Sequence, residues 1–504
     1  MPAADQRAGK RELLVSKTWI QVAGLVVLVG FFVLVLLAYR TYQSDPPIPD
    51  KVVDPSGRVL FTGNDIRAGQ KVFLHHGLME YGSIFGHGAY LGPDFTDDYL
   101  HRSSAIVEDE LGGSGSDSAR QETIDQFQTN RYDSTTKTLP LSAQQASAFG
   151  QLRQHYSDFL DSDTTRFGLL PNPVKGPTEI HQLTAFFAWS SWAASVRRPG
   201  HNYSYTNNWP PEPQVDNTPS ANVVVWSVIS LIALLGGIGV LFAVFGRWRL
   251  GWQGRDQATL SFRSPGDVAL TPGQQATAWF FFVMAALFLL QTLVGGMSQH
   301  YRADLDGFFG IDIANVFPYN LVRTWHVQLA IFFVATSFVA AGIFLAPMIA
   351  GREPKGQRKL AFFLLGALAV VVFGSLFGEF ADIHNWFSGT IFGDQGFEYL
   401  DLGRFWQVLL IVGLCVWGFI LYRGLKGRLS KERVGNMPWL FFLAALAIPA
   451  FYAVGLLVRA GDNFTITDYW RFWVVHLWVE DFLELFTTTM VAYVFVLLGV
   501  VRER

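Results

Sequence analysis

The chain has 504 residues, of which half are hydrophobic and only 16% are charged. Soluble domains carry about a quarter charged residues, so the composition favours a membrane protein. The formal net charge of −3 gives no basic excess, which argues against nucleic acid as a partner. The single cysteine, Cys415, lies in an apolar run and excludes both an internal disulfide and a cysteine-rich metal site.

Eight apolar segments are long enough to cross a hydrocarbon core about 30 Å thick, which takes roughly 20 helical residues. In chain order they cover residues 19–38, 223–245, 275–294, 321–349, 360–377, 405–421, 438–457 and 469–501. The first is too long for a signal peptide and no small-residue cleavage site follows it, so we expect an uncleaved anchor. The pattern predicts an all-α polytopic membrane protein with about eight transmembrane helices.

Basic side chains collect at every second junction between these segments. They are Arg7, Lys10, Arg11, Lys17, Arg247, Arg249, Arg255, Arg352, Lys355, Arg358, Lys359, Arg423, Lys426, Arg428, Lys431, Arg433, Arg502 and Arg504. Because positive charge stays on the cytoplasmic side, the N-terminus is predicted to be cytoplasmic. The long loops 43–222, 300–320 and 378–404 are then predicted to face outward.

The predicted domains are an N-terminal tail and anchor at 1–42, an outer domain at 43–222, a linking helix and cytoplasmic loop at 223–260, and a helical bundle at 261–504. Within the outer domain, residues 71–74 and 143–160 are predicted to be helical, and much of the remainder to be turns and loops. The proline-rich piece at 209–213 is predicted to be a stiff linker into the second span.

Three ionisable residues share one stripe of the last apolar segment. His476 and Glu480 are four residues apart, so their side chains leave the same face of a helix, and Glu484 continues the stripe one turn later. An imidazole and a carboxylate together suit a first-row metal, especially non-haem iron. A hydrogen-bonded His–Glu pair between helices remains open as the alternative. Glu484 on its own suits proton transfer better than ligation.

Other histidines and acids near the membrane allow two interpretations each. His326 suits an axial haem ligand or a histidine bonded to a backbone carbonyl. His300 and Asp304, at the end of the third apolar segment, suit proton acceptance from a quinol or an interfacial cap. One loop contains five acidic residues, which either bind calcium or are simply solvated: Glu379, Asp382, Asp394, Glu398 and Asp401. The other histidines are expected to be structural: His75, His76, His87, His101, His155, His181, His201 and His384.

Several strings together carry a family resemblance. They are GNDIRAGQ at 63–70, GHGAYLGPDF at 86–95, GG at 295–296 leading into HYRAD at 300–304, TWH at 324–326, EYLD at 398–401 and HLWVE at 476–480. From about residue 15 onward the chain resembles the single-chain, quinol-dependent nitric oxide reductases of the haem–copper oxidase superfamily. The resemblance implies a partial oxidase-type bundle behind an extracytoplasmic cytochrome c-like domain that lacks haem c, since there is no Cys-x-x-Cys-His.

The resemblance implies a reaction and the residues that perform it. Nitric oxide would be reduced to nitrous oxide with electrons from quinol, in a bacterial or archaeal cell membrane, for denitrification or detoxification. His326 would bind a low-spin haem b that feeds a high-spin haem b. His476 and Glu480 would bind a non-haem iron, with Glu480 and Glu484 catalytic. Glu398 would bind calcium, His300 and Asp304 would bind quinol, and Asp401 and Glu484 would carry protons.

The resemblance also implies ligands that this chain does not supply. The family has about twice as many core helices, including a His-His pair and two further haem histidines beyond Glu480. We therefore expect a truncated or split version, inactive alone, whose missing half could come from an adjacent chain, and a homodimer remains open. The alternatives are a non-catalytic remnant or partial subunit that binds haem, and an oxygen-reducing oxidase. Glu480 argues against the oxidase, because those enzymes hold copper with histidines alone.

Overall fold

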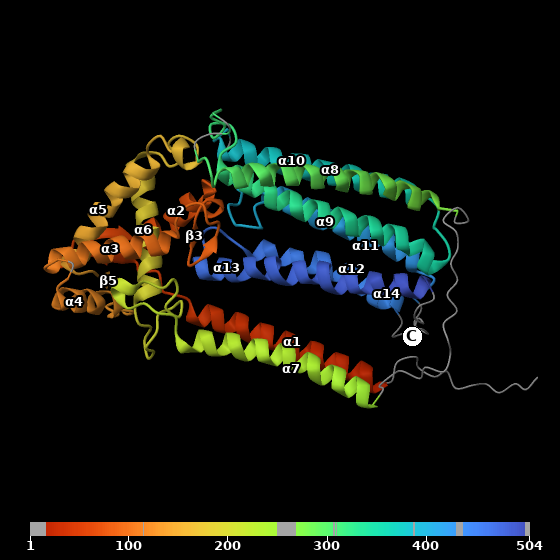
Figure 1. Cartoon of the computed structure of the whole chain (residues 1–504), viewed down its shortest axis with the longest axis horizontal. Coiled ribbons are helices and arrows are strands. Elements are labelled where there is room, and N and C mark those ends of the chain that lie inside the picture. Colours follow the sequence, from red (N-terminus) through yellow and green to blue (C-terminus); the bar gives the residue numbers. More distant parts are fainter. Residues whose placement is uncertain are drawn as a thin grey trace, which may run out of the picture.

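The computed structural model describes residues 17–113, 115–248, 269–305, 308, 310–386, 389–429 and 437–498. Long helices form one end of the molecule and a smaller helical domain caps the other (Figure 1). Seven helices of the described residues are long and apolar enough to cross a membrane. The chain is therefore a multi-pass membrane protein with a mostly helical fold, as predicted.

Five long helices make the core of the membrane bundle. They are α8 (Pro272–His300), α9 (Tyr319–Ala350), α10 (Gln357–Ile383), α11 (Arg404–Leu425) and α12 (Met437–Ala453). α9 is the most buried of them and packs along α8. Gly295 permits close packing there, because a Cβ at this position would overlap the imidazole of His326.

The eighth predicted span is helical but not one regular helix. It begins as α13 (Phe464–Phe472), passes through π-helical η7 (Trp473–Trp478) and η8 (Asp481–Phe486), and ends as α14 (Thr487–Leu497). For this reason it is not among the seven regular spans. Each π turn inserts an extra residue and re-aims the side chains that follow, which the 3.6-residue pattern of the sequence could not indicate.

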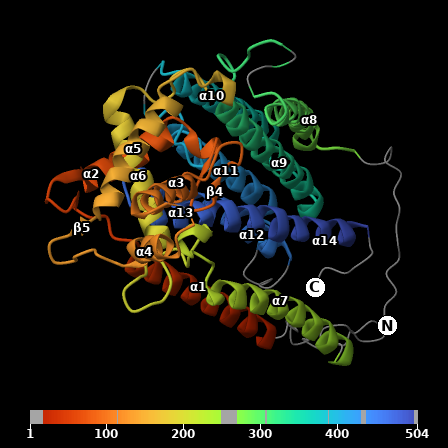
Figure 2. The ribbon, with the colours of Figure 1, turned by 60° about the vertical axis from the view of Figure 1, so that its left-hand side comes forward.

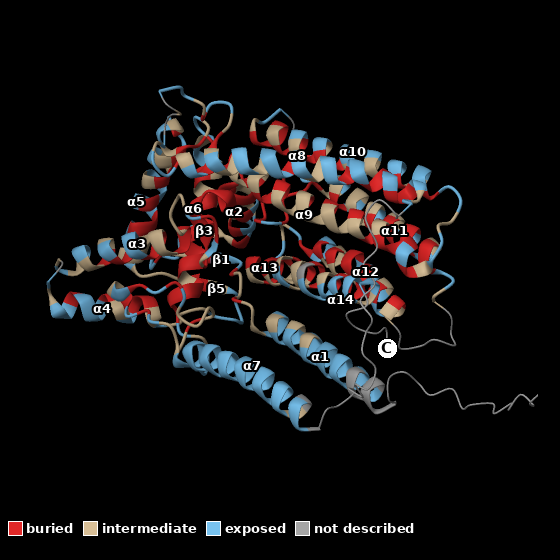
Figure 3. Ribbon diagram, turned by 45° about the vertical axis from the view of Figure 1, so that its right-hand side comes forward, coloured by how far each residue is buried: buried red, intermediate tan, exposed pale blue. Residues whose placement is uncertain are grey.

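Helices α1 (Lys17–Ser44) and α7 (Ala221–Trp248) lie side by side, away from the other spans (Figures 1 and 2). Their apolar windows are 0% buried (Figure 3), so in a bilayer they face lipid or further helices. α1 is attached at its outer end, where the Trp470 indole donates to the Tyr42 hydroxyl at 2.9 Å.

The junctions on the far side of the bundle from the outer domain are partly described. The Arg423 guanidinium donates to the Lys355 carbonyl at 2.8 Å, so two of the basic junctions meet. The basic residues at 1–16, 249–268, 430–436 and 499–504 lie outside the described residues.

The outer domain contains more helix than predicted. α2 (Gly63–His75) and α5 (Ala143–Leu160) contain the two predicted helical stretches, but α3 (Phe95–Leu111), α4 (Asp117–Gln128) and α6 (Gly176–Ser195) replace predicted loops. Asp94 and Ser116 cap α3 and α4 by accepting from backbone N–H groups, a signal that the sequence already contained.

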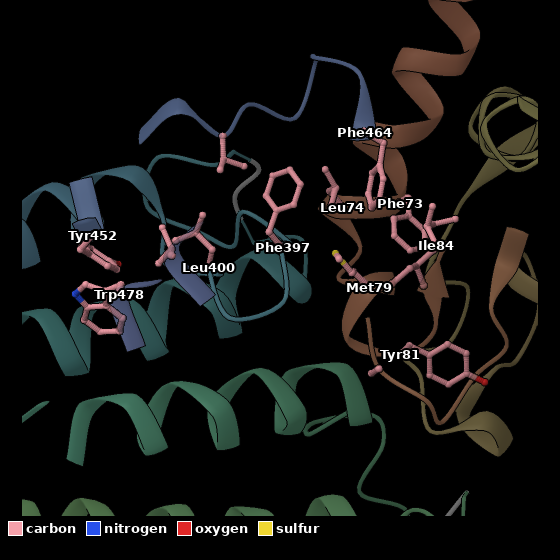
Figure 4. Packing of buried hydrophobic residues seen from close by; sticks show 14 of the residues in the cluster. Phe73, Leu74, Met79, Tyr81, Ile84, Phe397, Leu400, Tyr452, Phe464 and Trp478 are labelled. Atoms are coloured by element: carbon pink, nitrogen blue, oxygen red, sulfur yellow. The ribbon is translucent and has the colours of Figure 1, made fainter. Parts of the chain in front are cut away.

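Short strands complete the domain. β1 (Lys51–Val53) pairs antiparallel with β2 (Val59–Thr62) and parallel with β5 (Thr138–Pro140), while β3 (Ser83–Ile84) pairs with β4 (His87–Gly88). Stacked aromatic rings fill the core, including Phe95 on Phe187 with ring centres 4.6 Å apart. The buried cluster continues from Phe73 and Leu74 through Phe397 and Leu400 to Trp478 in the bundle (Figure 4).

The prediction of a stiff linker at 209–213 is wrong. This piece leads into η3 (Pro213–Val215) and is bonded to α3 and α4. Nδ1 of His101 in α3 lies 3.0 Å from Oε2 of Glu212, and the Arg120 guanidinium in α4 donates to the Pro213 carbonyl at 3.3 Å. The prolines therefore belong to the packed domain.

We predict that Gly69→Ala destabilises the outer domain. A Cβ there would overlap the Gln182 carbonyl oxygen, so α2 and α6 would have to separate, at a cost of about 1–3 kcal/mol. Gly150→Ala is the control, because its Cβ would meet nothing within 4 Å in α5, and it should stabilise by roughly 0.5–1 kcal/mol. Thermal unfolding of the full chain in detergent measures both, and a wild-type melting temperature for Gly69→Ala would contradict the packing.

Candidate functional site

Arg323 links the outer domain to the membrane bundle. It lies near the start of α9, and its guanidinium donates to Oε1 of Glu398 at 2.6 Å. A second nitrogen lies 3.8 Å from Oε2 of Glu80, a fully buried residue of the outer domain. The Arg323 side chain thus joins Glu80 and Glu398, which are far apart in the sequence. Arg323 also lies only three residues before His326.

Arg471 of α13 extends this ion-pair network. Its Nε donates to Oδ1 of Asp468 at 2.8 Å, and its other end donates to the Glu398 carbonyl at 3.0 Å. Asp468 is also hydrogen-bonded to Nδ1 of His87 from the GHGAY string. Arg471 is 3% exposed, so a partner removed here would leave a buried charge.

Further carboxylates are buried beside this network. Asp394 and Asp401 are 1% and 0% exposed, and both are close enough to Glu80 for the charges to repel. Burial raises the pKa of Glu80 to about 7, and burial followed by repulsion from Glu80 raises the pKa of Asp401 well above its usual range. Glu80 and Asp401 are therefore able to hold protons near neutral pH. Asp401 lies in the loop that was predicted to be either solvated or calcium-binding.

His326 is oriented by α8. Its Nδ1 lies 3.1 Å from the Gln291 backbone carbonyl oxygen, which can only accept, so Nδ1 carries the proton. Its Nε2 is then an acceptor, and the side-chain amide nitrogen of Gln291 lies 3.4 Å from it. The imidazole lines a cavity of about 380 Å³ whose polar lining includes Arg302, Arg323 and Tyr319. The bond to a backbone carbonyl, one of the two interpretations from the sequence, is present, and the haem-ligand role of His326 stays a prediction.

A second cavity, of about 370 Å³, adjoins the first through Ala330, Ile331 and Tyr399. Its lining is apolar and comes largely from α9 and η7. An apolar space beside an imidazole and two arginines has the chemistry that a haem needs, because the ring is apolar and its propionates are anionic. The residues present thus fit a haem at His326.

His476 and Glu480 lie together on η7 and the residues after it. Nε2 of His476 is 3.4 Å from Oε1 of Glu480, and the side chains are 54% and 44% exposed. Glu484 is exposed as well. The whole stripe therefore faces away from the other described helices. Asp481 beside it points inward, is 6% exposed, and receives no hydrogen bond from the described part of the chain on either oxygen.

The donor set for a metal is partial among the described residues. No group of three or more His, Cys, Asp or Glu side chains there has a metal-binding arrangement. His476 and Glu480 supply one nitrogen and one oxygen, which suits iron but leaves it short of ligands. Glu398 is held between two guanidiniums, and its calcium-binding role stays a prediction.

His300 and Asp304 meet at the outer end of α8. Nε2 of His300 is 3.6 Å from Oδ2 of Asp304, and the imidazole packs on the Phe308 ring at 4.5 Å. Their side chains are 22% and 38% exposed, so both can be reached from the membrane boundary. The quinol-binding role of this pair stays a prediction.

Reasoning from sequence missed the partners of these residues. Glu80, His87, Asp468 and Arg471 come from the outer domain and from α13, and their pairing depends on tertiary contacts. The one available signal was charge within an apolar segment, which identifies Arg323 and Arg471 as residues that need a partner. His87 had been expected to be merely structural, yet it connects the outer domain to α13.

We predict that Arg471→Met destabilises the protein by about 3–5 kcal/mol, because Asp468 and Glu398 would stay buried without their cation. Arg102→Met is the matched control, since Arg102 pairs with Asp98 at 2.8 Å on the surface and should cost only about 0.3–0.5 kcal/mol. Chemical unfolding of the full chain in detergent would measure both. Equal effects of the two substitutions would contradict the role given to the buried network.

The bond to Asp468 raises the pKa of His87 above its ordinary value of about 6.5. A raised folded-state pKa adds stability that is complete below the unfolded-state value and is lost as pH rises through the folded-state value. We therefore predict that His87→Gln lowers the melting temperature more at pH 5.5 than at pH 9. A pH-independent difference would show that the imidazole is not charged in this pair.

Comparisons with known proteins agree with this arrangement. Residues 49–211 match the NorB cytochrome c-like domain of nitric oxide reductase, and residues 275–500 match cytochrome c and quinol oxidase polypeptide I. The NorB subunit of the nitric oxide reductase of Stutzerimonas stutzeri is 29% identical over 237 residues, which are 45% of this chain and 47% of the relative. The match thus spans about half of that relative's length. The chain is therefore similar to nitric oxide reductases of the haem–copper oxidase superfamily in both its outer domain and its membrane helices.

Proposed function

We propose that this chain forms the quinol-oxidising part and one wall of the metal site of a nitric oxide reductase, which reduces nitric oxide to nitrous oxide. The observation that carries the proposal is the pairing of His476, on a π-helical turn, with Glu480, 3.4 Å away in the same apolar segment. π turns occur frequently at functional sites, and ionisable groups within a membrane are costly unless they are used.

His326 would hold a low-spin haem b through Nε2. Its carbonyl-bonded Nδ1 fixes the ring, and Arg302 and Arg323 in the same cavity would balance the propionates. A haem b in this position supplies one-electron transfer. A second, high-spin haem b is implied by the family and would take ligands from beyond the described residues.

His476 and Glu480 would hold the non-haem iron, and Glu484 on the same exposed stripe would hold a proton for the product water. The remaining ligands would come from further membrane helices that cover this stripe. In support, the stripe is polar and stays uncovered by the described residues. This arrangement favours the reductase over the oxygen-reducing oxidases, because a carboxylate oxygen is a harder ligand than imidazole and suits iron.

Quinol is the proposed electron donor, with His300 and Asp304 accepting its protons and Asp401 holding a proton further inward. Two observations support quinol as the donor in place of electron entry through a haem c. The cytochrome c-like domain has no Cys-x-x-Cys-His motif, and its core is filled by aromatic rings around a cavity of only about 40 Å³. Glu398 would act as a carboxylate held in place by Arg323 and Arg471.

The proposed orientation places the N-terminus in the cytoplasm of a bacterial or archaeal cell and residues 43–222 outside. In support, Arg423 and Lys355 meet at the end of the bundle opposite the outer domain, and that end collects basic residues. Quinol, nitric oxide and lipid would then be the partners of this chain.

Reciprocal substitutions test the metal assignments. Glu480→Ala in the purified, cofactor-loaded protein should lose most of the non-haem iron and keep the low-spin haem absorption, because it removes one iron ligand. His326→Ala should lose that absorption and keep the iron. Elemental analysis and visible spectra measure both quantities without turnover. Unchanged iron in Glu480→Ala would remove Glu480 from the ligand set.

A further inference from the structure

A polar cavity of about 220 Å³ lies where the outer domain meets the outer ends of α9 and α10. It is separate from the His326 cavity and from the His476 stripe. Its lining comes from four parts of the chain and includes His76, Asn172, Lys175, Asn320, His384 and Asn385. Since a water takes about 30 Å³ of liquid, the cavity holds several waters or one small head group.

His384 presents a hydrogen-bond acceptor to this cavity. Its Nδ1 lies 2.7 Å from the Phe380 carbonyl oxygen, so Nδ1 carries the proton and Nε2 is an acceptor. Nε2 is buried, and no donor among the described residues reaches it. The imidazole is held in place by stacking on the Phe380 ring at 4.1 Å, which fixes the direction in which Nε2 points.

Asn320 presents a second acceptor. Its amide nitrogen donates to the His76 carbonyl at 2.9 Å, which fixes the amide and leaves Oδ1 available to accept. Asn320 is 4% exposed, and its Oδ1 is buried without a hydrogen-bond partner within the described ranges. Because buried acceptors normally find a donor, the two sites together call for a molecule with two hydrogen-bond donors.

Groups of both charge signs lie around the cavity, which favours a neutral molecule. Glu179 lies 3.5 Å from Nε2 of His76, and Asp382 lies 3.8 Å from Nδ1 of the neighbouring His75. Lys175 adds a cation at the mouth, and the other polar lining residues are asparagine amides. Neither a strongly anionic nor a strongly cationic ligand would gain from this environment.

The cavity lies at the level of the membrane–water boundary. Trp386, two residues beyond His384, is 64% exposed, and its ring packs on Phe380 at 5.3 Å. Trp325 also stacks on the Phe380 ring. Exposed tryptophan beside the end of a membrane helix marks the head-group layer of a bilayer. A molecule that reaches the cavity can therefore be one that is dissolved in the lipid.

We propose that this cavity binds the neutral, hydroxyl-bearing head group of a membrane lipid through His384 and Asn320. Two sources share this chemistry, the ring of a quinol and the glycerol head of a neutral lipid. The quinol source rests on the proposed function, and it would place a quinol at a second position besides His300. The glycerol source does not depend on that function.

Equilibrium binding of a short-tailed quinol and of a monoacylglycerol to the full chain in phosphatidylcholine nanodiscs tests the proposal. His384→Phe keeps the stack on Phe380 and removes the acceptor, and Asn320→Leu removes the amide at similar volume. Each should weaken binding of at least one probe by about tenfold, the loss expected for one buried hydrogen bond. His201→Phe, an exposed histidine of the outer domain, is the control, and melting curves establish that each variant is folded.

The outcomes separate this site from the proposed function. Loss of quinol or monoacylglycerol binding in the folded His384→Phe variant supports the site. If the wild type binds only the monoacylglycerol, the site is still supported, and only the proposal that quinol is the electron donor fails. Wild-type affinity for both probes in His384→Phe and Asn320→Leu overturns the site and leaves a cavity filled with water only. If only His300→Phe loses quinol binding, and the protein binds no monoacylglycerol, the site is overturned and the proposal that quinol is the electron donor stands.

Discussion

The structure depends on a buried chain of ion pairs at the junction between the outer domain and the membrane helices. Arg323 and Arg471 hold Glu398 between them, Glu80 lies beside Arg323, and His87 reaches Asp468. Such pairs contribute little net stability but are costly to break, so they fix which surfaces meet. The outer domain is thereby held in one position over the bundle, tied to α9, to α13 and to the loop that follows α10.

This junction also sets the geometry of the candidate redox site. Arg323 precedes His326 by one helical turn, so the pair with Glu398 fixes the height of the imidazole in α9. Gly295 then lets α8 approach closely enough for the Gln291 carbonyl to orient Nδ1. Arg471 precedes the π-helical stretch that carries His476 and anchors its start. Because one ion-pair network anchors both α9 and η7, the cavity beside His326 and the apolar cavity lined by η7 stay next to each other.

Much of this arrangement was predictable from sequence, because a membrane restricts what a chain can do. The length of the apolar segments identified the seven regular spans, and intramembrane charge singled out His326, His476 and Glu480. The two π turns of the last segment were not predictable, since they depend on packing against α12. The sequence analysis did not predict the helices α3, α4 and α6, although Asp94 and Ser116 are N-cap residues that indicate the start of α3 and of α4. The pairing of outer-domain side chains with arginines and acids far along the chain depends on tertiary structure alone.

Above all, we infer that an iron outside a haem belongs on the stripe of His476 and Glu480. Total iron and haem determined together on the purified, cofactor-loaded protein test this inference most directly, with haem measured as its pyridine complex. We expect b-type haem only, and more iron than haem. Iron equal to haem would contradict the inference and reduce the stripe to a hydrogen-bonded His–Glu pair within the membrane.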